Sequence, residues 1–275
     1  MEPFGERLWG ALREHGPLCV GVDPHAELLA AWGLPDDATG AETFGRRVVE
    51  ALAGRVAVVK PQSAFFERFG SAGVRALEAV LADARAAGLL CIIDVKRGDI
   101  GSTAAAYAAA YLNPDSPLSA DALTVSPYLG FGSLQPFLDA AAAHNGGVFV
   151  LALTSNPEGP QVQHARAPDG RSVAGVMLEA VRRQNFGVRP QGSVGVVVGA
   201  TIGSTDEDLA INGPLLVPGL GAQGGGGADL RRIFGAVAGN VVPSVSREVL
   251  RAGPNPGALA DAAQRAAGEY ASALG

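Results

Sequence analysis

The feature that most constrains the fold of this chain is a series of short apolar segments that recur along its whole length. Each segment is nearly continuous in apolar residues and is bounded by glycine or proline, which is typical of strands buried on both faces of a parallel sheet. We predict strands, in chain order, at residues 18–23, 56–60, 89–96, 120–126, 147–155, 193–199, 214–219 and 241–247.

The segments between these strands carry apolar residues at helical spacing. We predict helices at residues 41–53, 72–87, 103–111, 133–144, 172–185, 228–238 and 256–274. Strands that alternate with helices over 275 residues predict an α/β protein, specifically a closed (β/α)8 TIM barrel that forms one domain over residues 1–275. An open doubly wound sheet is the alternative. Residues 155–171 and 201–212 are too long for plain turns and are candidate lids.

The composition excludes several classes of partner. A net charge of −6, a pI near 5.2 and the absence of a Lys/Arg block argue against nucleic acid and anionic membrane surfaces. The N-terminal segment is charged where a signal peptide is apolar, and no stretch of apolar residues is long enough to span a bilayer. We therefore expect no membrane association and a cytoplasmic location. Cys19 and Cys91 lie inside apolar runs and are expected to be buried, reduced thiols.

Polar residues stand at the carboxyl ends of the predicted strands, where barrels carry their chemistry. The polar strand-end residues are Asp23, Lys60, Asp94, Lys96, Ser126, Thr154, Ser155, Ser246 and Arg247. In a barrel, the charged residues among them would converge on one mouth.

The densest group of charges follows the third predicted strand. Asp94 and Lys96 are two residues apart, so they share one face of the strand. Lys60 on the neighbouring strand can reach Asp94, and Asp99 lies in the turn that follows. Alternating carboxylates and ammonium groups hold one another ionised. This pattern predicts a charged site without a metal, and the four histidines have no metal-ligand spacing.

A glycine-rich segment, residues 217–227, follows the seventh predicted strand and precedes a helix. Backbone N–H groups in such a segment can bind an anion. With Arg247 after the eighth strand, the segment matches the phosphate site that barrels often form after strands seven and eight. A flexible surface loop is the alternative explanation of the glycine run alone.

The pattern Asp94-x-Lys96-x-x-Asp99-Ile100-x-x-Thr103 resembles the signature of the orotidine 5′-phosphate decarboxylases, and the resemblance extends from Asp23 to Arg247. Segments 60–67, 124–130 and 198–201 are similar to the longer bacterial subgroup, type 2. The resemblance implies a TIM-barrel carboxy-lyase that converts orotidine 5′-monophosphate (OMP) to UMP and CO2. That reaction is the last step of de novo pyrimidine biosynthesis and uses no cofactor.

The resemblance also implies roles for individual residues. Lys60, Asp94, Lys96 and Asp99 would form the charged tetrad of the family, with Lys96 as proton donor to C6 of the pyrimidine and Asp94 facing the substrate carboxylate. Asp99 and Thr103 would reach into the partner subunit's site, which makes the enzyme a homodimer with shared sites.

The remaining roles concern substrate binding. Asp23 and Lys60 would hold the ribose hydroxyls, and Ser155 would contact the amide of the pyrimidine ring. Gln223, Arg247 and the backbone near Ser246 would bind the phosphate, and Pro218 would be a further substrate contact.

Three alternatives remain. Similar patterns occur in metal-dependent phosphosugar decarboxylases and synthases, which are expected to carry an additional acidic ligand where Lys60 stands. A Schiff-base aldolase would need an uncharged lysine, which the flanking carboxylates disfavour. A non-catalytic barrel that binds a phosphate ligand would be expected to have lost part of the tetrad.

Overall fold

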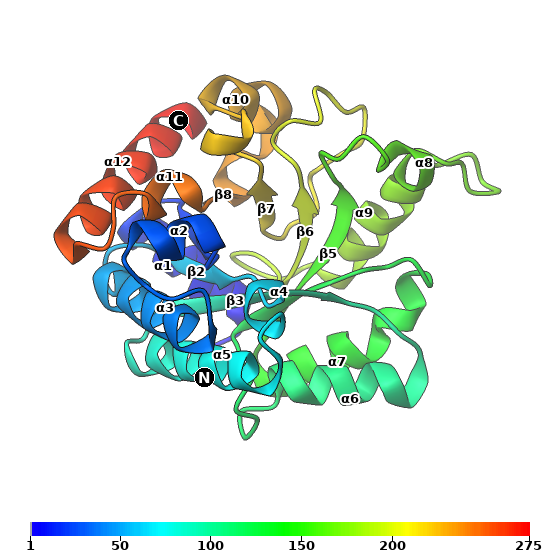
Figure 1. The fold of residues 1–275 in the computed structure, drawn as a ribbon. Helices are drawn as coiled ribbons and strands as arrows, with labels where there is room; N and C mark the ends of the chain where they lie inside the picture. The colour runs from blue at the N-terminus through cyan, green and yellow to red at the C-terminus, as the bar shows by residue number, and fades with distance from the viewer. Residues whose placement is uncertain (1) are drawn as a thin grey trace.

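A computed structural model describes residues 2–275, and its eight parallel strands close into a barrel in chain order (Figure 1). The strands are β1 (Cys19–Val22), β2 (Val58–Pro61), β3 (Leu90–Arg97), β4 (Ala122–Val125), β5 (Gly147–Leu153), β6 (Val194–Val198), β7 (Leu215–Pro218) and β8 (Val241–Val245). Each lies within one of the segments predicted from apolar runs or within one residue of it.

The barrel closes because β1 pairs with β8 as well as with β2. Cys19 is in register with Ser244 on one side and with Val58 on the other. The TIM barrel is thus confirmed, and the open doubly wound sheet is excluded. Closure pairs every strand on both edges, while the packed interior and the surrounding helices bury apolar residues on both faces of the strands.

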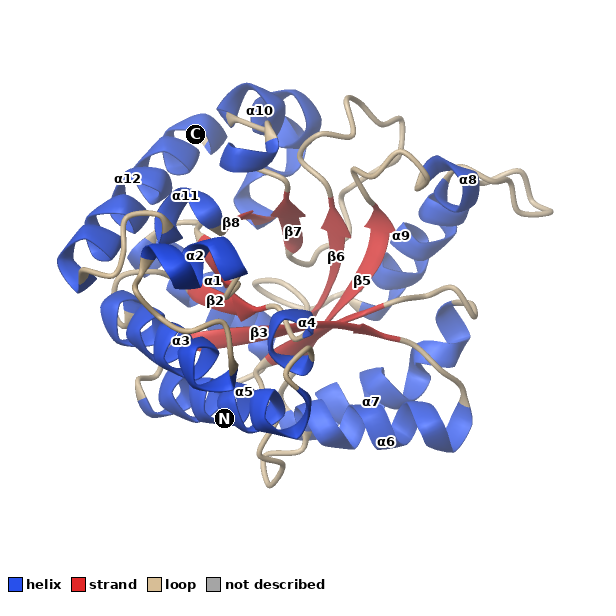
Figure 2. Ribbon diagram, viewed as in Figure 1, coloured by secondary structure: helices blue, strands red, loops and turns tan. Residues whose placement is uncertain are grey.

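Helices surround the ring of strands, as Figure 2 shows in blue and red. The helices are α1 (Phe4–His15), α2 (Ala26–Ala31), α3 (Ala38–Leu52), α4 (Ala64–Glu67), α5 (Gly70–Ala86), α6 (Gly101–Leu112), α7 (Gln135–His144), α8 (Pro160–Gln163), α9 (Val173–Gln184), α10 (Gly227–Phe234), α11 (Arg247–Leu250) and α12 (Pro256–Leu274). Three 3-10 turns complete the chain: η1 (Phe131–Leu134), η2 (Gly221–Gln223) and η3 (Gly235–Asn240). All seven predicted helices are present, although the one predicted at 228–238 is divided between α10 and η3.

Helix α1, which the sequence patterns did not predict, packs against the interior of the barrel. Phe4 and Leu8 are fully buried in the inner core. The ring of Phe4 meets that of Phe149 on β5 edge-on, at 5.9 Å between centroids and 84° between planes. This packing closes the floor of the barrel with apolar side chains.

The strand period of two places the site directly above this apolar layer. Inward-facing residues of the inner core include Cys19, Val58, Ile92, Ala122 and Val242. Two positions further along the same strands, the same inner face carries Gly21, Lys60, Asp94, Thr124 and Ser244. The barrel thus changes from apolar to polar within one layer, at the carboxyl ends of its strands.

The two long loops of the sequence remain largely irregular. Residues 155–171 contain only the short helix α8, and residues 201–212 contain no helix or strand. Among residues 2–275, no helix combines the length and the apolar character that crossing a membrane requires.

Candidate active site

A cavity of about 460 Å³ opens at the carboxyl ends of the strands. Of the residues predicted from the sequence, the cavity wall contains Asp23, Lys60, Asp94, Lys96, Pro218, Gln223, Ser246 and Arg247. The structure therefore brings together side chains from the ends of β1, β2, β3, β7 and β8.

Asp94 is the centre of the charged group. Asp94 is 6% exposed, and its carboxylate accepts a hydrogen bond from Lys60 Nζ at 2.8 Å on Oδ2. Lys96 Nζ donates to Oδ1 at 2.6 Å. Lys60 is buried, whereas the side chain of Lys96 is 45% exposed and faces the cavity. One buried carboxylate thus orients two ammonium groups, of which one is accessible to a ligand.

The charges on Asp94 and Lys60 maintain each other against burial. Burial alone would raise the pKa of Asp94, but the ammonium groups of Lys60 and Lys96 overcome this and lower it below its usual value. Burial alone would likewise lower the pKa of Lys60, yet the carboxylates of Asp94 and Asp23 raise it above its usual value. Both groups are therefore charged at neutral pH.

The sequence patterns missed Thr124, which completes the contacts of Asp94. Thr124 lies on β4, and its Oγ1 donates to Asp94 Oδ1 at 2.8 Å. Its position two residues after the buried Ala122, on the inner face, is the signal that identifies it.

Two other polar atoms of the cavity have no partner. Asp23 Oδ1 and Ser246 Oγ are buried without a hydrogen bond. A buried polar atom without a partner costs about 1–3 kcal/mol, so both atoms have hydrogen-bonding capacity that water or a ligand in the cavity would satisfy. They lie close together because Gly21 lacks a side chain: a Cβ there would stand 2.9 Å from Ser246 Cβ and 3.1 Å from Asp23 Oδ2.

The end of the cavity near β7 and β8 carries Gln223 and Arg247, whereas the backbone N–H groups of Gly221, Gln223, Gly224 and Gly225 already donate within the glycine-rich segment. Gly219 and Gly221 have φ values of +99° and +59°, a conformation that glycine adopts without strain. They direct η2 across the cavity, where Gln223 and Arg247 form part of the wall. Asp229 accepts from the backbone N–H of Gly226, so this carboxylate already caps α10.

Three predicted residues lie outside the cavity wall. Ser155 is exposed, and its Oγ lies so close to Gly199 that a Cβ there would be 2.0 Å away. Asp99 Oδ1 accepts from the backbone N–H of Ile100, and Thr103 is exposed on α6. A single chain therefore does not bring Asp99 and Thr103 to its own cavity.

The cavity wall also contains side chains that sequence patterns did not identify. Gln62 follows β2, and the rings of His25 and Phe65 pack 4.1 Å apart between centroids. They lie in the segments after β1 and β2. His25 has no special spacing in the sequence, so only the fold places it here.

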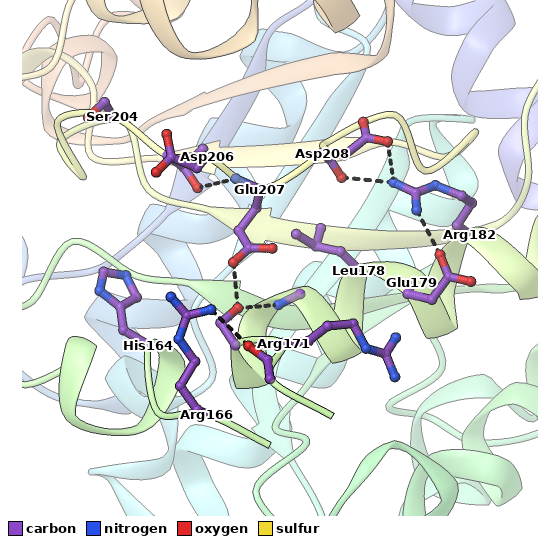
Figure 3. Close-up of a pocket in the computed structure, with 14 residues that line it drawn as sticks. His164, Arg166, Arg171, Leu178, Glu179, Arg182, Ser204, Asp206, Glu207 and Asp208 are labelled. Carbon is purple, nitrogen blue, oxygen red and sulfur yellow. Dashed lines mark hydrogen bonds and ion pairs between the residues drawn. The ribbon is translucent and has the colours of Figure 1, made fainter. Parts of the chain in front are cut away.

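A second hollow, shown in Figure 3, lies between α9 and the loops 155–171 and 201–212. Ser172 donates to Glu207, and Arg182 is paired with both Glu179 and Asp208. Arg182 is thus shared by two carboxylates, and no residue that lines the hollow has a buried side-chain polar atom without a partner. The hollow lies between the two candidate lids, whereas the buried atoms without a partner, Asp23 Oδ1 and Ser246 Oγ, belong to the cavity at the barrel mouth.

Within residues 2–275, His, Cys, Asp and Glu side chains form no cluster of three or more that could hold a metal ion. The expectation of a metal-free site stays a prediction. Cys19 and Cys91 are buried and unpaired, and burial raises the pKa of Cys19 to about 11. The expectation of buried thiols is confirmed.

Comparison with known proteins agrees with this geometry. Residues 16–263 match the model of the orotidine 5′-phosphate decarboxylase / HUMPS family. The orotidine 5′-phosphate decarboxylase of Salinispora arenicola is 62% identical over 275 residues, which is 100% of this chain and 99% of the relative.

Solved structures show the same similarity. A crystal structure from Streptomyces avermitilis has a TM-score of 0.96 at 61% identity and covers 100% of this chain and 96% of that one. The OMP decarboxylase of Leishmania donovani has a TM-score of 0.75 at 32% identity and covers 98% and 99% of the two chains. By sequence and by fold, the chain belongs to the orotidine 5′-phosphate decarboxylase / HUMPS family.

Proposed function

We propose that this protein decarboxylates OMP to UMP and CO2, the last step of de novo pyrimidine biosynthesis, as a carboxy-lyase. The observation that carries the proposal is the Asp94 carboxylate, buried between the ammonium groups of Lys60 and Lys96 in the wall of a ligand-sized cavity. The family match and the 62% identity over the full chain support the same reaction.

The chemistry follows from the accessible ammonium group. When the bond between C6 and the carboxylate breaks, CO2 leaves and the electron pair remains on C6 in the plane of the ring. Lys96 stabilises this charge and then transfers a proton to C6, which gives UMP and a neutral amine that solvent reprotonates. Preorganised charge of this kind needs no reorientation during the reaction. Asp94 faces the substrate carboxylate and keeps both lysines in place.

The lysine content of the chain agrees with this role. The sequence contains only two lysines, Lys60 and Lys96, and every other basic side chain except histidine is an arginine. Arginine does not give up its proton in proteins, whereas lysine can. Both lysine ammonium groups, which are able to donate a proton, therefore lie in this cavity.

The rest of the substrate would occupy the unpaired polar groups. We assign the ribose hydroxyls to Asp23 and Lys60, and the phosphate to Gln223, Arg247 and the region of Ser246, with Pro218 as a further contact. Ser155 would contact the pyrimidine amide after movement of the loop that begins with it. Phosphate binding far from C6 can drive loop closure and thereby assemble the reactive geometry.

We further propose a homodimer with shared sites, in which Asp99 and Thr103 enter the partner's cavity. Large apolar side chains on the segments after β3 and β4 support this: Ile100 is 63% exposed, Tyr128 79% and Leu129 53%. Neighbouring exposed apolar residues are typical of an interaction surface. Each chain would act as one domain in the cytoplasm.

The alternatives have less support. A metal-dependent phosphosugar enzyme would be expected to carry an acidic ligand at the position of Lys60. A Schiff-base aldolase needs an uncharged amine, but Lys60 and Lys96 both pair with Asp94. A barrel that only bound phosphate would not require the buried charges at the opposite end of the cavity.

The direct test is the loss of OMP absorbance in EDTA-treated protein. We expect metal-free turnover by the wild type and near-complete loss in Lys96→Ala. Arg231→Ala, on the exposed face of α10, is the control and should retain full activity. A folded wild type without OMP turnover, but with metal-dependent activity on a sugar phosphate, would exclude the decarboxylase assignment.

A further inference from the structure

Thr124 occupies an unusual position between β3 and β4. Its side chain is almost fully buried, and its Oγ1 lies 2.8 Å from Asp94 Oδ1, 3.1 Å from the amide nitrogen of Val95 and 3.0 Å from that of Lys96. One hydroxyl thus contacts the Asp94 carboxylate and two successive backbone amides, those of Val95 and Lys96.

The chemistry of a hydroxyl fixes the direction of these three bonds. A threonine Oγ1 has one proton to donate and two lone pairs to accept. The amides of Val95 and Lys96 are donors only, so they occupy both lone pairs. The single hydroxyl proton must therefore point to Asp94.

The backbone of β3 departs from regular pairing at the same place. Its register with β4 shifts between Ile93 and Arg97, and Lys96 has a φ of +44°. A residue other than glycine in this conformation costs on the order of 1 kcal/mol and persists only where its surroundings hold it. The Thr124 hydroxyl accepts two amide hydrogen bonds within the irregular segment, so it is a side chain that holds this segment from the neighbouring strand.

The bulge determines where the Lys96 side chain points. A bulge changes the direction in which a strand residue projects. Here the side chain of Lys96 turns to the cavity while its Nζ lies 2.6 Å from Asp94 Oδ1, the same oxygen that Thr124 contacts. The position of the ammonium group therefore depends on a hydroxyl that does not itself carry out chemistry.

We propose that Thr124 is a positioning residue, which fixes the Lys96 ammonium and the Asp94 carboxylate in their reactive geometry through the β3 bulge. The inference rests on the proposed decarboxylase function and goes beyond it, because it identifies what holds the proton donor in place.

Two substitutions separate this role from simple packing. Thr124→Val keeps the shape of the side chain and removes the hydroxyl. Thr124→Ser keeps the hydroxyl and removes a methyl group. If Thr124 only fills space, Thr124→Val should be the milder change. If Thr124 positions Lys96, Thr124→Ser should be the milder change.

The kinetic test compares kcat, KM for OMP and the affinity for UMP in the two variants. Thr124→Val should lower kcat about 100-fold, as expected for a misplacement of roughly 1 Å at the reacting centre. UMP affinity should change little, because the ribose and phosphate contacts are untouched, and Thr124→Ser should stay close to wild type. A Val variant with wild-type kcat, or a Ser variant as slow as Val, would overturn the proposal.

A second measurement does not depend on turnover. Protein labelled with [ε-13C]lysine gives only two side-chain lysine signals, from Lys60 and Lys96. In Thr124→Val the Lys96 signal should shift and the amides of Val95 and Lys96 should exchange faster with solvent, whereas Thr124→Ser should change neither. If the Lys96 signal and the amide exchange rates of Val95 and Lys96 were unchanged in Thr124→Val, the proposal would be contradicted.

These measurements distinguish a failure of the proposed decarboxylase function from a failure of the proposed role of Thr124. Absence of OMP turnover by the wild type would remove the proposed function, while the lysine signals and amide exchange would still decide whether Thr124 holds the bulge. If Thr124→Val does not fold, Thr124→Cys replaces it, because a thiol of similar size is only a weak donor and acceptor. Equal kcat and equal amide protection in Cys and Ser would then overturn the proposal.

Discussion

At the scale of single residues, the site depends on mutual stabilisation of buried charges. Asp94 is held by Lys60, Lys96 and Thr124, which together occupy both of its oxygens. Removing one partner of a buried pair leaves an uncompensated charge and typically costs 3–5 kcal/mol. The same contacts that orient Lys96 for chemistry therefore contribute to the stability of the barrel.

The directions of the two pKa shifts predict how stability depends on pH. Because the folded protein lowers the pKa of Asp94, its contribution is complete above the unfolded value of about 3.9 and is lost as pH falls below that value toward the folded pKa. Because the pKa of Lys60 is raised, its contribution is complete below about 10.4 and is lost as pH rises through the folded pKa.

Denaturant unfolding at a series of pH values tests this expectation. Asp94→Asn should lower the free energy of unfolding at pH 7 and should flatten its decrease in acid. Asp83→Asn, which removes a carboxylate from an exposed pair with Arg46, should change stability by about 0–1 kcal/mol. If the free energy of unfolding of Asp94→Asn fell in acid as steeply as that of the wild type, Asp94 would not be the source of the pH dependence.

At the scale of elements, the carboxyl ends of β7 and β8 form a separate part of the site. Glycines at positive φ bring η2 to the cavity, and Arg247 begins the short helix α11. Glu248, the next residue, accepts from the Tyr270 hydroxyl of α12 at 2.9 Å. The closing helix of the barrel is therefore tied to α11, the short helix that begins with Arg247.

Substitution of Arg247 tests the phosphate assignment. Arg247→Ala should lower kcat/KM for OMP roughly tenfold to hundredfold, since a hydrogen bond to a charged group is worth about 1.5–3 kcal/mol. Arg251→Ala, four residues further and exposed, is the matched control and should behave as wild type. With orotidine, which lacks the phosphate, Arg247→Ala and wild type should be equal; an equal loss on both substrates would assign Arg247 to another role.

At the scale of the whole molecule, one barrel does not complete the predicted tetrad. Asp99 bonds to its own backbone neighbour, and the cavity wall of the single chain does not include it. The exposed Ile100 follows directly in sequence. An arrangement in which these residues cover the cavity of a second copy accounts for both observations.

Mixed dimers test whether sites are shared. Asp99→Ala and Lys96→Ala should each be nearly inactive alone. When the two are unfolded, mixed and refolded together, a heterodimer contains one site with both residues intact, so activity should reappear. Sedimentation should give a dimer throughout. If mixing restores nothing although heterodimers form, Asp99 acts within its own chain.

The sequence by itself determined the barrel and the charged residues of the cavity. Continuous apolar runs are required wherever both faces of a strand are buried, so the eight strands could be located without coordinates. Charges at the ends of such runs are costly unless they are used, which identified Lys60, Asp94 and Lys96. The glycine run before α10 and the arginine after β8 similarly predicted a phosphate site, and Gln223 and Arg247 both line the cavity.

Only the tertiary structure decided which side chains meet. Thr124 lies in an ordinary strand sequence, Ala-Leu-Thr-Val, because threonine favours strands for its shape alone. Its role depends on the register between β3 and β4, and register is a relation between segments far apart in the chain. The same reason applies to α1, whose Phe4 finds its partner Phe149 only once the barrel has closed. A sequence records the period and chemistry of each element, whereas contacts between elements are set by how all of them pack together.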